Sequence, residues 1–276
     1  MSPKDMEVIL VEEPDFTPEN IAEWNKTNEP NVHNNKKVEY SDDVCKQLGD
    51  GIKATLAANK NPVEVSGGTG YEIVKRIFDI VVSLIVLPFV ILIMIVFGII
   101  IFAHDGGSPL FIQTRFTKNG KPFKMLKLRS MVIDAEARKE EAIKEDREKN
   151  GENEGNNQIT TKLTNDSRIT PIGEFIRKTS IDEIPQFFNV LFGQMTLVGP
   201  RPAIPSEIAN YEPRHMERMR VKAGLTCYHQ CEARGDNDFE KWLESDFRYI
   251  RKRSLSIDLK ILYKTAIAVI KKDGAK

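Results

Sequence analysis

The sequence has few cysteines and no excess of either charge, and both absences narrow its function. Three cysteines in 276 residues, Cys45, Cys227 and Cys231, cannot form the disulfide framework of a small secreted domain. Their odd number fits a reducing compartment. Lys plus Arg and Asp plus Glu number 40 each, so the net charge is zero. A general nucleic-acid binder needs a basic excess to neutralise phosphates, so we expect no nucleic-acid partner.

The zero net charge conceals a division of the chain into two parts. Residues 1–74 carry seven Lys or Arg and 14 Asp or Glu, a net charge of −7. The remaining residues carry 33 basic and 26 acidic side chains, a net charge of +7. We therefore expect anionic partners on the basic part that follows residue 74.

Long apolar runs are also absent, with one exception. Residues 80–103 read IVVSLIVLPFVILIMIVFGIIIFA and contain no charged side chain. A helix of this length is about 36 Å long, enough to cross a hydrocarbon core of about 30 Å. The run therefore predicts insertion into a membrane.

The charges beside this run favour re-entry over a full crossing. Lys75, Arg76 and Asp79 precede it, and a second basic group at 115–129 follows it. A crossing helix would place one basic flank outside, against the preference of Lys and Arg for the cytoplasmic side. Pro88 removes a helix hydrogen bond and can bend the chain. We predict a re-entrant helical hairpin that turns at Pro88, with an ordinary kinked transmembrane helix as the alternative.

The rest of the chain predicts one compact cytoplasmic domain of mixed α/β class, mostly helical. We assign residues 1–70 to a polar N-terminal extension and linker, and residues 71–107 to the membrane-inserted helix. The catalytic domain is expected at 108–276. Within it, residues 134–160 are charged and nearly free of apolar side chains toward their end, which predicts a solvated helix and a mobile loop.

Two adjacent acids, Asp182 and Glu183, are the candidate catalytic residues. A structural interpretation is available: Ser180 and Glu183 have the spacing of a capping box at a helix start. Pro185 also fits only if a helix begins near this point. Adjacent helical residues point in different directions, so one acid can act as a nucleophile while the other holds a hard cation such as Mg²⁺.

Basic residues near the acids predict a phosphate-bearing substrate. Arginine and lysine are the side chains that most often bind phosphoryl oxygens, and those near the acids are Arg168, Arg177, Lys178 and Arg201. Arg201 lies in the motif GPRP, whose two prolines restrict the backbone around it. Each arginine alone is equally typical of a solvated surface. Their number around two acids, beside a membrane segment, favours the phosphate interpretation.

Four long motifs occur in order along the chain: KRIFD (75–79), SPLFIQTRFTKNGKPFKMLKLRSM (108–131), RITPIGEFIRKTSIDEIPQFFNVLFGQMTLVGPRP (168–202) and KAGLTCYHQCEARGDNDFEKW (222–242). In these motifs the chain resembles the bacterial sugar transferase family of monotopic phosphoglycosyl transferases, which start lipid-linked glycan assembly. The resemblance covers Tyr71 to Gly274. It implies an enzyme on the cytoplasmic face of the bacterial inner membrane, among membrane lipids. The pathway would be exopolysaccharide, capsule, O-antigen or glycoprotein glycan synthesis.

The resemblance also implies a two-step reaction. Asp182 would attack the β-phosphate of a UDP-sugar, release UMP and carry the sugar phosphate, which polyprenyl (undecaprenyl) phosphate then accepts. Glu183 would hold Mg²⁺. The residues expected to bind substrate are Arg115, Lys127, Arg129, Arg168, Arg177, Arg201, Gln230 and Arg234. Lys75, Arg76, Asp79 and Pro88 would belong to the membrane hairpin.

The sequence departs from the family pattern at a few positions. Leu87 stands where members usually have serine before the hairpin proline, and Ala223 and Cys227 replace Pro and Gly, so the identity of the sugar stays open.

Cys227, His229 and Cys231 would share one face of a strand, as zinc ligands do, but the sequence supplies no fourth ligand. The alternative function is a non-catalytic monotopic scaffold or polyprenyl-phosphate binder. The role of residues 1–70 and the oligomeric state also stay open.

Overall fold

The computed structural model describes residues 40–135, 137–150, 163, 166–232 and 238–271. Its helices are α2 (Asp42–Ala58), α3 (Thr69–Asp105), α4 (Lys139–Asn150), α5 (Pro171–Lys178), α6 (Gln186–Leu191), α7 (Pro205–Ile208), α8 (Pro213–Met216), α9 (Tyr228–Glu232), α10 (Phe239–Lys252) and α11 (Leu255–Lys271). The strands are β1 (Leu110–Phe116), β2 (Pro122–Leu128), β3 (Thr196–Val198) and β4 (Gly224–Thr226), and short 3₁₀ turns are η2 (Lys118–Gly120), η3 (Ile181–Glu183) and η4 (Glu217–Arg220). The predicted mostly helical α/β class is confirmed.

The two sheets are small and serve as supports for the helices. Strands β1 and β2 pair antiparallel, from Leu110 opposite Leu128 to Phe116 opposite Pro122. Their turn contains Asn119 and Gly120, both with positive φ (57° and 71°), which is the backbone that Asn-Gly turns favour. Strands β3 and β4 form a short parallel pair elsewhere in the domain.

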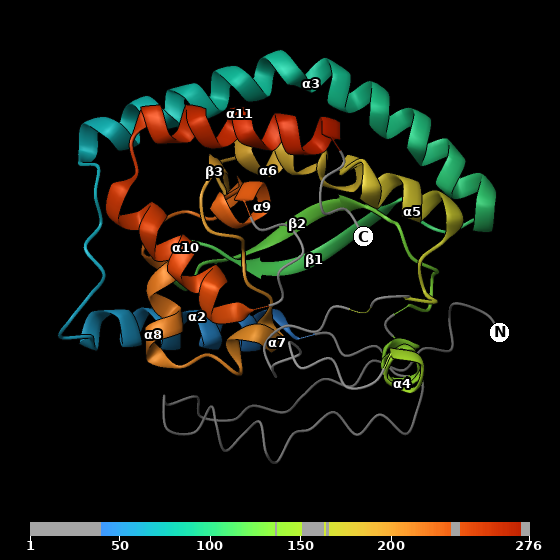
Figure 1. The fold of residues 1–276 in the computed structure, drawn as a ribbon, viewed down its shortest axis with the longest axis horizontal. Helices are drawn as coiled ribbons and strands as arrows, with labels where there is room; N and C mark the ends of the chain where they lie inside the picture. Colours follow the sequence, from blue (N-terminus) through green and yellow to red (C-terminus); the bar gives the residue numbers. More distant parts are fainter. Residues whose placement is uncertain (1–39, 136, 151–162, 164–165, 233–237, 272–276) are drawn as a thin grey trace.

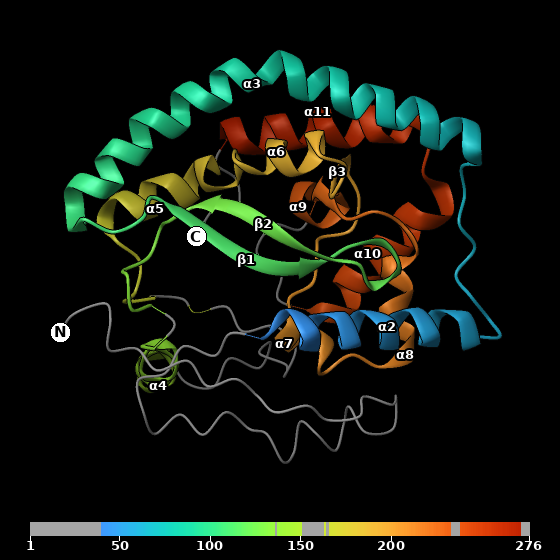
Figure 2. The ribbon, with the colours of Figure 1, turned by 180° about the vertical axis from the view of Figure 1, so that it is seen from behind.

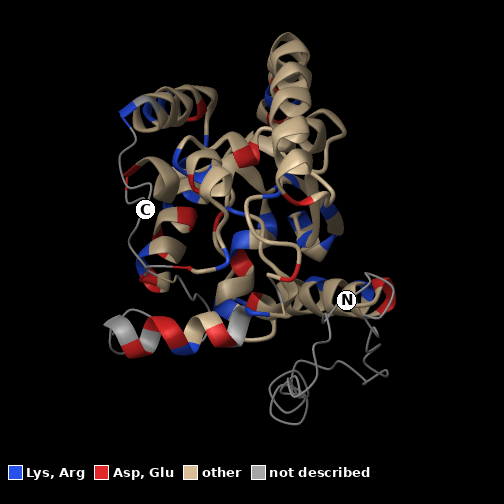
Figure 3. Cartoon of the chain, turned by 90° about the vertical axis from the view of Figure 1, so that its right-hand side faces the viewer, with Lys and Arg blue, Asp and Glu red and all other residues tan. Residues whose placement is uncertain are grey.

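Helix α3 arches over the whole domain, with α11, α6 and α5 beneath it (Figures 1 and 2). Among the described residues it is the one helix long and apolar enough to cross a membrane. Its buried positions, which contact the domain at both ends and in the middle, are Lys75, Asp79, Ser83, Val90, Gly98 and Ile101. Its remaining face exposes large apolar side chains, and most Lys, Arg, Asp and Glu positions of the domain lie below the top of the arch (Figure 3).

The sharp hairpin expected at Pro88 is not confirmed. The helix runs through Pro88 without a break, and curvature along its length brings both ends against the domain (Figure 1). Proline removes only its own N–H from the helix, so a long helix can absorb it as a bend. At the far end Gly106 adopts φ 71° and its N–H donates to the Phe102 carbonyl at 2.7 Å, which ends the helix.

Helix α2 lies inside the segment that the sequence assigns to an N-terminal extension, yet it is part of the packed domain. Ser41 caps it by accepting the Val44 N–H at 3.2 Å. Its apolar face forms one buried cluster with side chains of β1, α7, α8 and α10. The α2 members are Val44, Cys45, Leu48, Ile52 and Leu56. Figure 1 shows α2 on the side of the domain opposite α3.

A second buried cluster lies between the sheets and the helices under α3. It includes Phe123 and Met125 of β2, Leu197 of β3 and Ile250 of α10. A third, smaller cluster joins the C-terminal half of α3 to β2 and α5 through Ile101, Leu128 and Ile176. Strand β2 thus has its two ends in different clusters, which fixes the direction of the side chains between them.

Candidate active site

The two candidate acids lie on a short turn between α5 and α6. Helix α5 begins at Pro171, and the Thr170 hydroxyl accepts the Gly173 N–H at 3.0 Å. After α5 the chain reverses at Ser180, whose φ is 57°, and η3 then carries Asp182 and Glu183.

The capping-box interpretation is wrong. The Ser180 side chain makes no cap hydrogen bond, and the Ser180 carbonyl accepts the Glu183 N–H at 3.2 Å. The helix start predicted at Pro185 is confirmed, since Pro185 is the N-cap of α6. The two acids therefore precede α6 on a turn of their own, without a capping role.

Lys127 of β2 lies between the two carboxylates. Its Nζ is 3.6 Å from Asp182 Oδ2 and 3.3 Å from Glu183 Oε1. The side chains of Asp182, Glu183 and Lys127 are 14%, 25% and 18% exposed, so all three are shielded yet reachable from solvent. From α9, Gln230 Nε2 approaches Glu183 Oε2 at 3.5 Å. Three separate elements thus meet at the dyad.

Burial and the neighbouring charges act on the pKa of Asp182 in opposite directions. Burial raises the pKa of Asp182 above its ordinary value, and the neighbouring Glu183 carboxylate raises it further. The Lys127 ammonium and the Arg177 guanidinium act in the opposite direction and lower this pKa.

Arg115 and Arg201 form a cationic pair beside the dyad. Arg115 of β1 is buried and donates to the Pro202 carbonyl at 2.9 Å and to Gln113 Oε1 at 3.0 Å. Burial, together with the charge of Arg201, lowers the pKa of Arg115 to about 9, and Glu183 raises it. Within the described part of the chain, neither arginine forms an ion pair, and the buried Nε of Arg201 has no hydrogen-bond partner. Such unneutralised guanidinium groups are suited to a bound phosphate.

Sequence reasoning missed the side chains that support Arg201. Its guanidinium lies 5.8 Å from the Trp242 ring centroid, and His229 stacks on the same ring at 5.2 Å. Arg218 donates to the Arg201 carbonyl at 3.1 Å and forms a buried ion pair with Asp246 at 2.6 Å. The sequence did contain an indication of this ion pair. Asp246 lies among the apolar positions of α10, and a carboxylate buried there needs a cation as its partner.

Other predicted substrate residues have different neighbours. Arg129 forms an ion pair with Asp105 at the end of α3. Arg168 binds Asp166 at 2.7 Å and donates to the Ala135 carbonyl at 3.1 Å. Arg234 lies outside the described residues. Of the predicted set, the structure brings Lys127, Arg177 and Gln230 to the dyad and places the pair Arg115 and Arg201 nearby.

The zinc alternative assumed a strand at 227–231, but α9 begins at Tyr228. In a helix residues two positions apart point in nearly opposite directions, so His229 is turned away from Cys231, and Cys227 precedes the helix. Among the described residues no group of three or more His, Cys, Asp or Glu is placed to hold a metal. The residues suited to a divalent cation are the dyad carboxylates, because Mg²⁺ takes one or two carboxylates and completes its shell with water and phosphate.

Comparison with known proteins matches residues 70–272 to the family described as bacterial sugar transferase. The UDP-galactose-lipid carrier transferase of Erwinia amylovora is 40% identical over 203 residues, which are 73% of this chain and 41% of that protein. The undecaprenyl-phosphate galactose phosphotransferase of Salmonella typhimurium is 39% identical over 201 residues, 73% of this chain and 41% of that protein. The exopolysaccharide production protein ExoY of Rhizobium meliloti is 34% identical over 202 residues, 73% of this chain and 87% of ExoY. The chain spans about two fifths of the first two relatives.

Proposed function

Because the chain belongs to the bacterial sugar transferase family, we propose that it transfers a sugar 1-phosphate from a UDP-sugar to polyprenyl phosphate and releases UMP. The observation that carries this proposal is the dyad of Asp182 and Glu183 around Lys127, beside the unneutralised pair Arg115 and Arg201. Relatives that carry the names of galactose and glucose phosphate transferases support the same substrate class.

In the first step an Asp182 carboxylate oxygen attacks the β-phosphorus of the UDP-sugar. A phosphorus–oxygen bond to Asp182 forms, and the bond from the β-phosphorus to the bridging oxygen breaks, so UMP leaves with that oxygen. In the second step an oxygen of polyprenyl phosphate attacks the same phosphorus and releases the Asp182 carboxylate. The covalent route divides one displacement into two, each with a nucleophile that is ionised near neutral pH.

The basic side chains stabilise charge during both steps. The Lys127 ammonium favours the ionised form of Asp182, because it lowers the pKa of this carboxyl against the larger effect of burial. Arg115 and Arg201 supply guanidinium groups for the diphosphate oxygens, and these charges reach full strength in a shielded site. Gln230 approaches Glu183 from α9 and would help to orient its carboxylate once substrate is bound.

Mg²⁺ fits this site. The Lys127 ammonium lies 3.3–3.6 Å from both carboxylates, which supports the view that the pair attracts cations. Glu183 is the more exposed of the two acids. When bound, Mg²⁺ would neutralise diphosphate charge, with Glu183 as its protein ligand. Asp182 then remains available as the nucleophile.

The proposal includes a re-entrant, monotopic position of α3 in the cytoplasmic leaflet of a bacterial inner membrane. Both ends of α3 bind the same polar domain, through Lys75 with Asp258 at one end and Asp105 with Arg129 at the other. A helix that crossed the bilayer would place these two ends about 55 Å apart on opposite sides. The exposed apolar face of the arch is then buried in lipid, and the dyad faces the cytoplasm near the bilayer surface.

Cysteine labelling tests this position of α3 independently of catalysis. Lys53→Cys on α2 and Lys118→Cys between the β1 and β2 strands lie on exposed sites before and after the helix. In a Cys231→Ser background, an impermeant thiol reagent added to intact cells should label neither site, and both should react after lysis. Labelling of one site alone from outside would establish a crossing helix.

Release of UMP tests the reaction. Full-length protein in detergent, a panel of UDP-sugars and Mg²⁺ should release UMP continuously only when polyprenyl phosphate is present. With a sugar donor labelled on its β-phosphate and no acceptor, the protein itself should become labelled, and added polyprenyl phosphate should remove the label. Turnover without labelled protein would reject the covalent step. No turnover with any donor, from folded protein, would favour a lipid-binding scaffold.

A further inference from the structure

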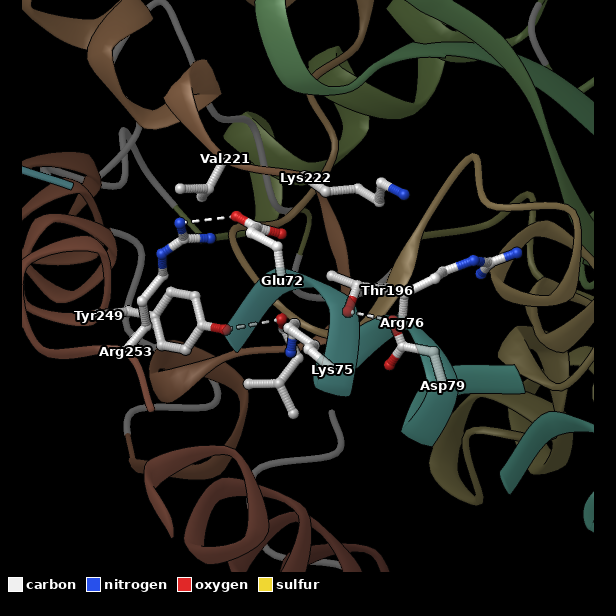
Figure 4. A pocket seen from close by; sticks show the side chains of 10 residues that line it. Glu72, Lys75, Arg76, Asp79, Thr196, Val221, Lys222, Tyr249 and Arg253 are labelled. Atoms are coloured by element: carbon white, nitrogen blue, oxygen red, sulfur yellow. Dashed lines mark hydrogen bonds and ion pairs between the residues drawn. The ribbon is translucent and has the colours of Figure 1, made fainter. Parts of the chain in front are cut away.

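A cavity separate from the dyad lies under the first turns of α3. Its volume is about 70 Å³, room for about two water-sized groups. It is formed by α3 together with β3, the segment before β4, and α10 with the residue that follows it (Figure 4). None of the dyad residues lines it. Arg76, in its wall, binds the C-terminal end of α6, whereas Asp182 precedes the N-terminal end of that helix.

The carboxylates around this cavity are already occupied. Glu72 pairs with Arg253 at 2.6 Å. Asp79 accepts the Thr196 hydroxyl at 2.7 Å and the Leu197 N–H at 3.1 Å. These contacts, two of which are drawn in Figure 4, satisfy the acids without Arg76 or Lys222.

Two cations of the cavity, Arg76 and Lys222, form no ion pair with a carboxylate in the described part of the chain. Arg76 donates to the Val190 and Leu191 carbonyls at 2.6 and 2.7 Å, which are neutral acceptors. Lys222 is half-buried, and within the described part of the chain it forms no ion pair or hydrogen bond. The side chains of Arg76 and Lys222 extend toward the same side of the cavity (Figure 4). Burial, and then repulsion from Arg76, lowers the pKa of Lys222, while the Asp79 and Glu72 carboxylates act in the opposite direction without reversing the shift.

The position of the cavity along α3, at the edge of its apolar run, indicates which kind of anion the cavity binds. Arg76 lies one helical turn before the uncharged run that begins at Ile80, and the exposed face of α3 carries apolar side chains from Ile73 onward. Basic side chains at this boundary reach the level of lipid phosphates. The excess of basic residues after residue 74 agrees with an anionic membrane surface.

We propose that Arg76 and Lys222 form a site for the headgroup phosphate of an anionic glycerophospholipid, distinct from the site of sugar-phosphate transfer. The bound lipid would rest beside the beginning of α3 and hold it against the end of α6. This inference rests on the membrane position of α3 in the proposed function, but not on the transfer reaction.

Native mass spectrometry of the full-length protein in neutral detergent tests the site. Phosphatidylglycerol is the probe, phosphatidylcholine the neutral comparison, and polyprenyl phosphate and inorganic phosphate are separate arms. Lys222→Gln should weaken phosphatidylglycerol binding about tenfold, because one charge-assisted contact is lost. Lys222→Arg should retain binding. Lys53→Gln, which removes the same charge from α2 on the far side of the domain, should bind as the unaltered protein does (Figure 1).

Three outcomes would overturn the proposal. The first is unchanged phosphatidylglycerol binding by Lys222→Gln whose thermal midpoint without lipid equals that of the parent. The second is equal affinity for phosphatidylglycerol and phosphatidylcholine. The third is a loss confined to polyprenyl phosphate, or displacement of phosphatidylglycerol by inorganic phosphate, since either would assign these cations to another phosphate source. Arg76 is left unaltered because its contacts with Val190 and Leu191 also support α6.

Discussion

Two groups of charged side chains in this protein differ in how completely their contacts are satisfied. Where α3 meets the domain, Asp258 accepts hydrogen bonds from Lys75, Tyr71 and Tyr249 at 2.7–2.9 Å, and its side chain is 3% exposed. At the dyad, Asp182 has Lys127 at 3.6 Å as its ion-pair partner among the described residues. The contacts of Asp258 are short, shielded from solvent and fully satisfied. The contact of Asp182 with Lys127 is longer and partly exposed to solvent.

The difference separates structural charge from functional charge. A buried carboxylate with three donors has no capacity left for a ligand, and removing a partner leaves a buried charge uncompensated. A carboxylate whose pKa is raised by burial, with one distant ammonium, can still exchange its contacts for those of a substrate. We therefore expect substitutions at Asp258 to change stability and substitutions at Asp182 to change activity.

The largest effect is expected for Asp182→Asn. Loss of the nucleophile should lower UMP release at least about a thousandfold. Because the raised pKa of Asp182 means that its ionisation opposes folding, the thermal midpoint at neutral pH should stay equal or rise. Asp43→Asn, at an exposed position of α2, is the matched control and should change neither quantity. A lowered midpoint in Asp182→Asn would remove the distinction between the two groups.

The second effect concerns Asp258→Ala, which leaves the Lys75 ammonium buried without its partner. The loss should be about 3 kcal/mol of unfolding free energy, or roughly 6–12 °C in the thermal midpoint in detergent. Replacing both partners, with Lys75→Met and Asp258→Leu, should recover most of it because no charge remains buried. UMP release per folded molecule should persist at low temperature in the double variant. A double variant as unstable as Asp258→Ala would show that the ion pair itself is not the cause.

The pH dependence of kcat/KM gives the third, intermediate effect. The ionised form of Asp182 attacks, so the rate should fall as the pH falls through its raised pKa. The Lys127 ammonium lowers that pKa, so Lys127→Met should move the acid limb of the profile to higher pH. Lys127→Arg should leave the limb near its original position. Lys124→Met, on the exposed side of β2, is the control. An unmoved limb in Lys127→Met would assign the titration to another group.

The sequence indicated the two adjacent acids and the start of α6, because Pro185 can begin a helix but not continue one. Lys127 was expected only as a substrate-binding residue implied by the family resemblance, and its place between the two acids was not predicted. The sequence did not predict which partner each remote basic residue takes. Arg168 binds Asp166, two residues away, while Arg129 binds Asp105 across a turn. Residue type alone does not distinguish these contacts from contacts with a substrate.

Packing over long separations was also beyond the sequence. Helix α2 shows an apolar stripe from Val44 to Leu56, which predicts one buried face. The side chains that cover this face come from elements 60 to 200 residues later, such as Phe116 and Trp242, so the segment looked like an extension. The curvature of α3 has the same origin, since contacts at both of its ends with the domain decide it.

The smallest effect compares one contact from each group. Gln230→Met deletes a 3.5 Å contact with Glu183, and Thr196→Val deletes a 2.7 Å hydrogen bond to the buried Asp79. Both changes nearly preserve side-chain size. Thr196→Val should lower the unfolding free energy by about 1–3 kcal/mol, because it leaves a buried carboxylate short of a donor. Gln230→Met should leave the thermal midpoint unchanged and raise the KM for the UDP-sugar by about fivefold, since the weak contact matters only when substrate orders Glu183. Equal losses of stability in the two variants would mean that the dyad is as firmly held as the contacts of α3, and that its longer distances carry no functional meaning.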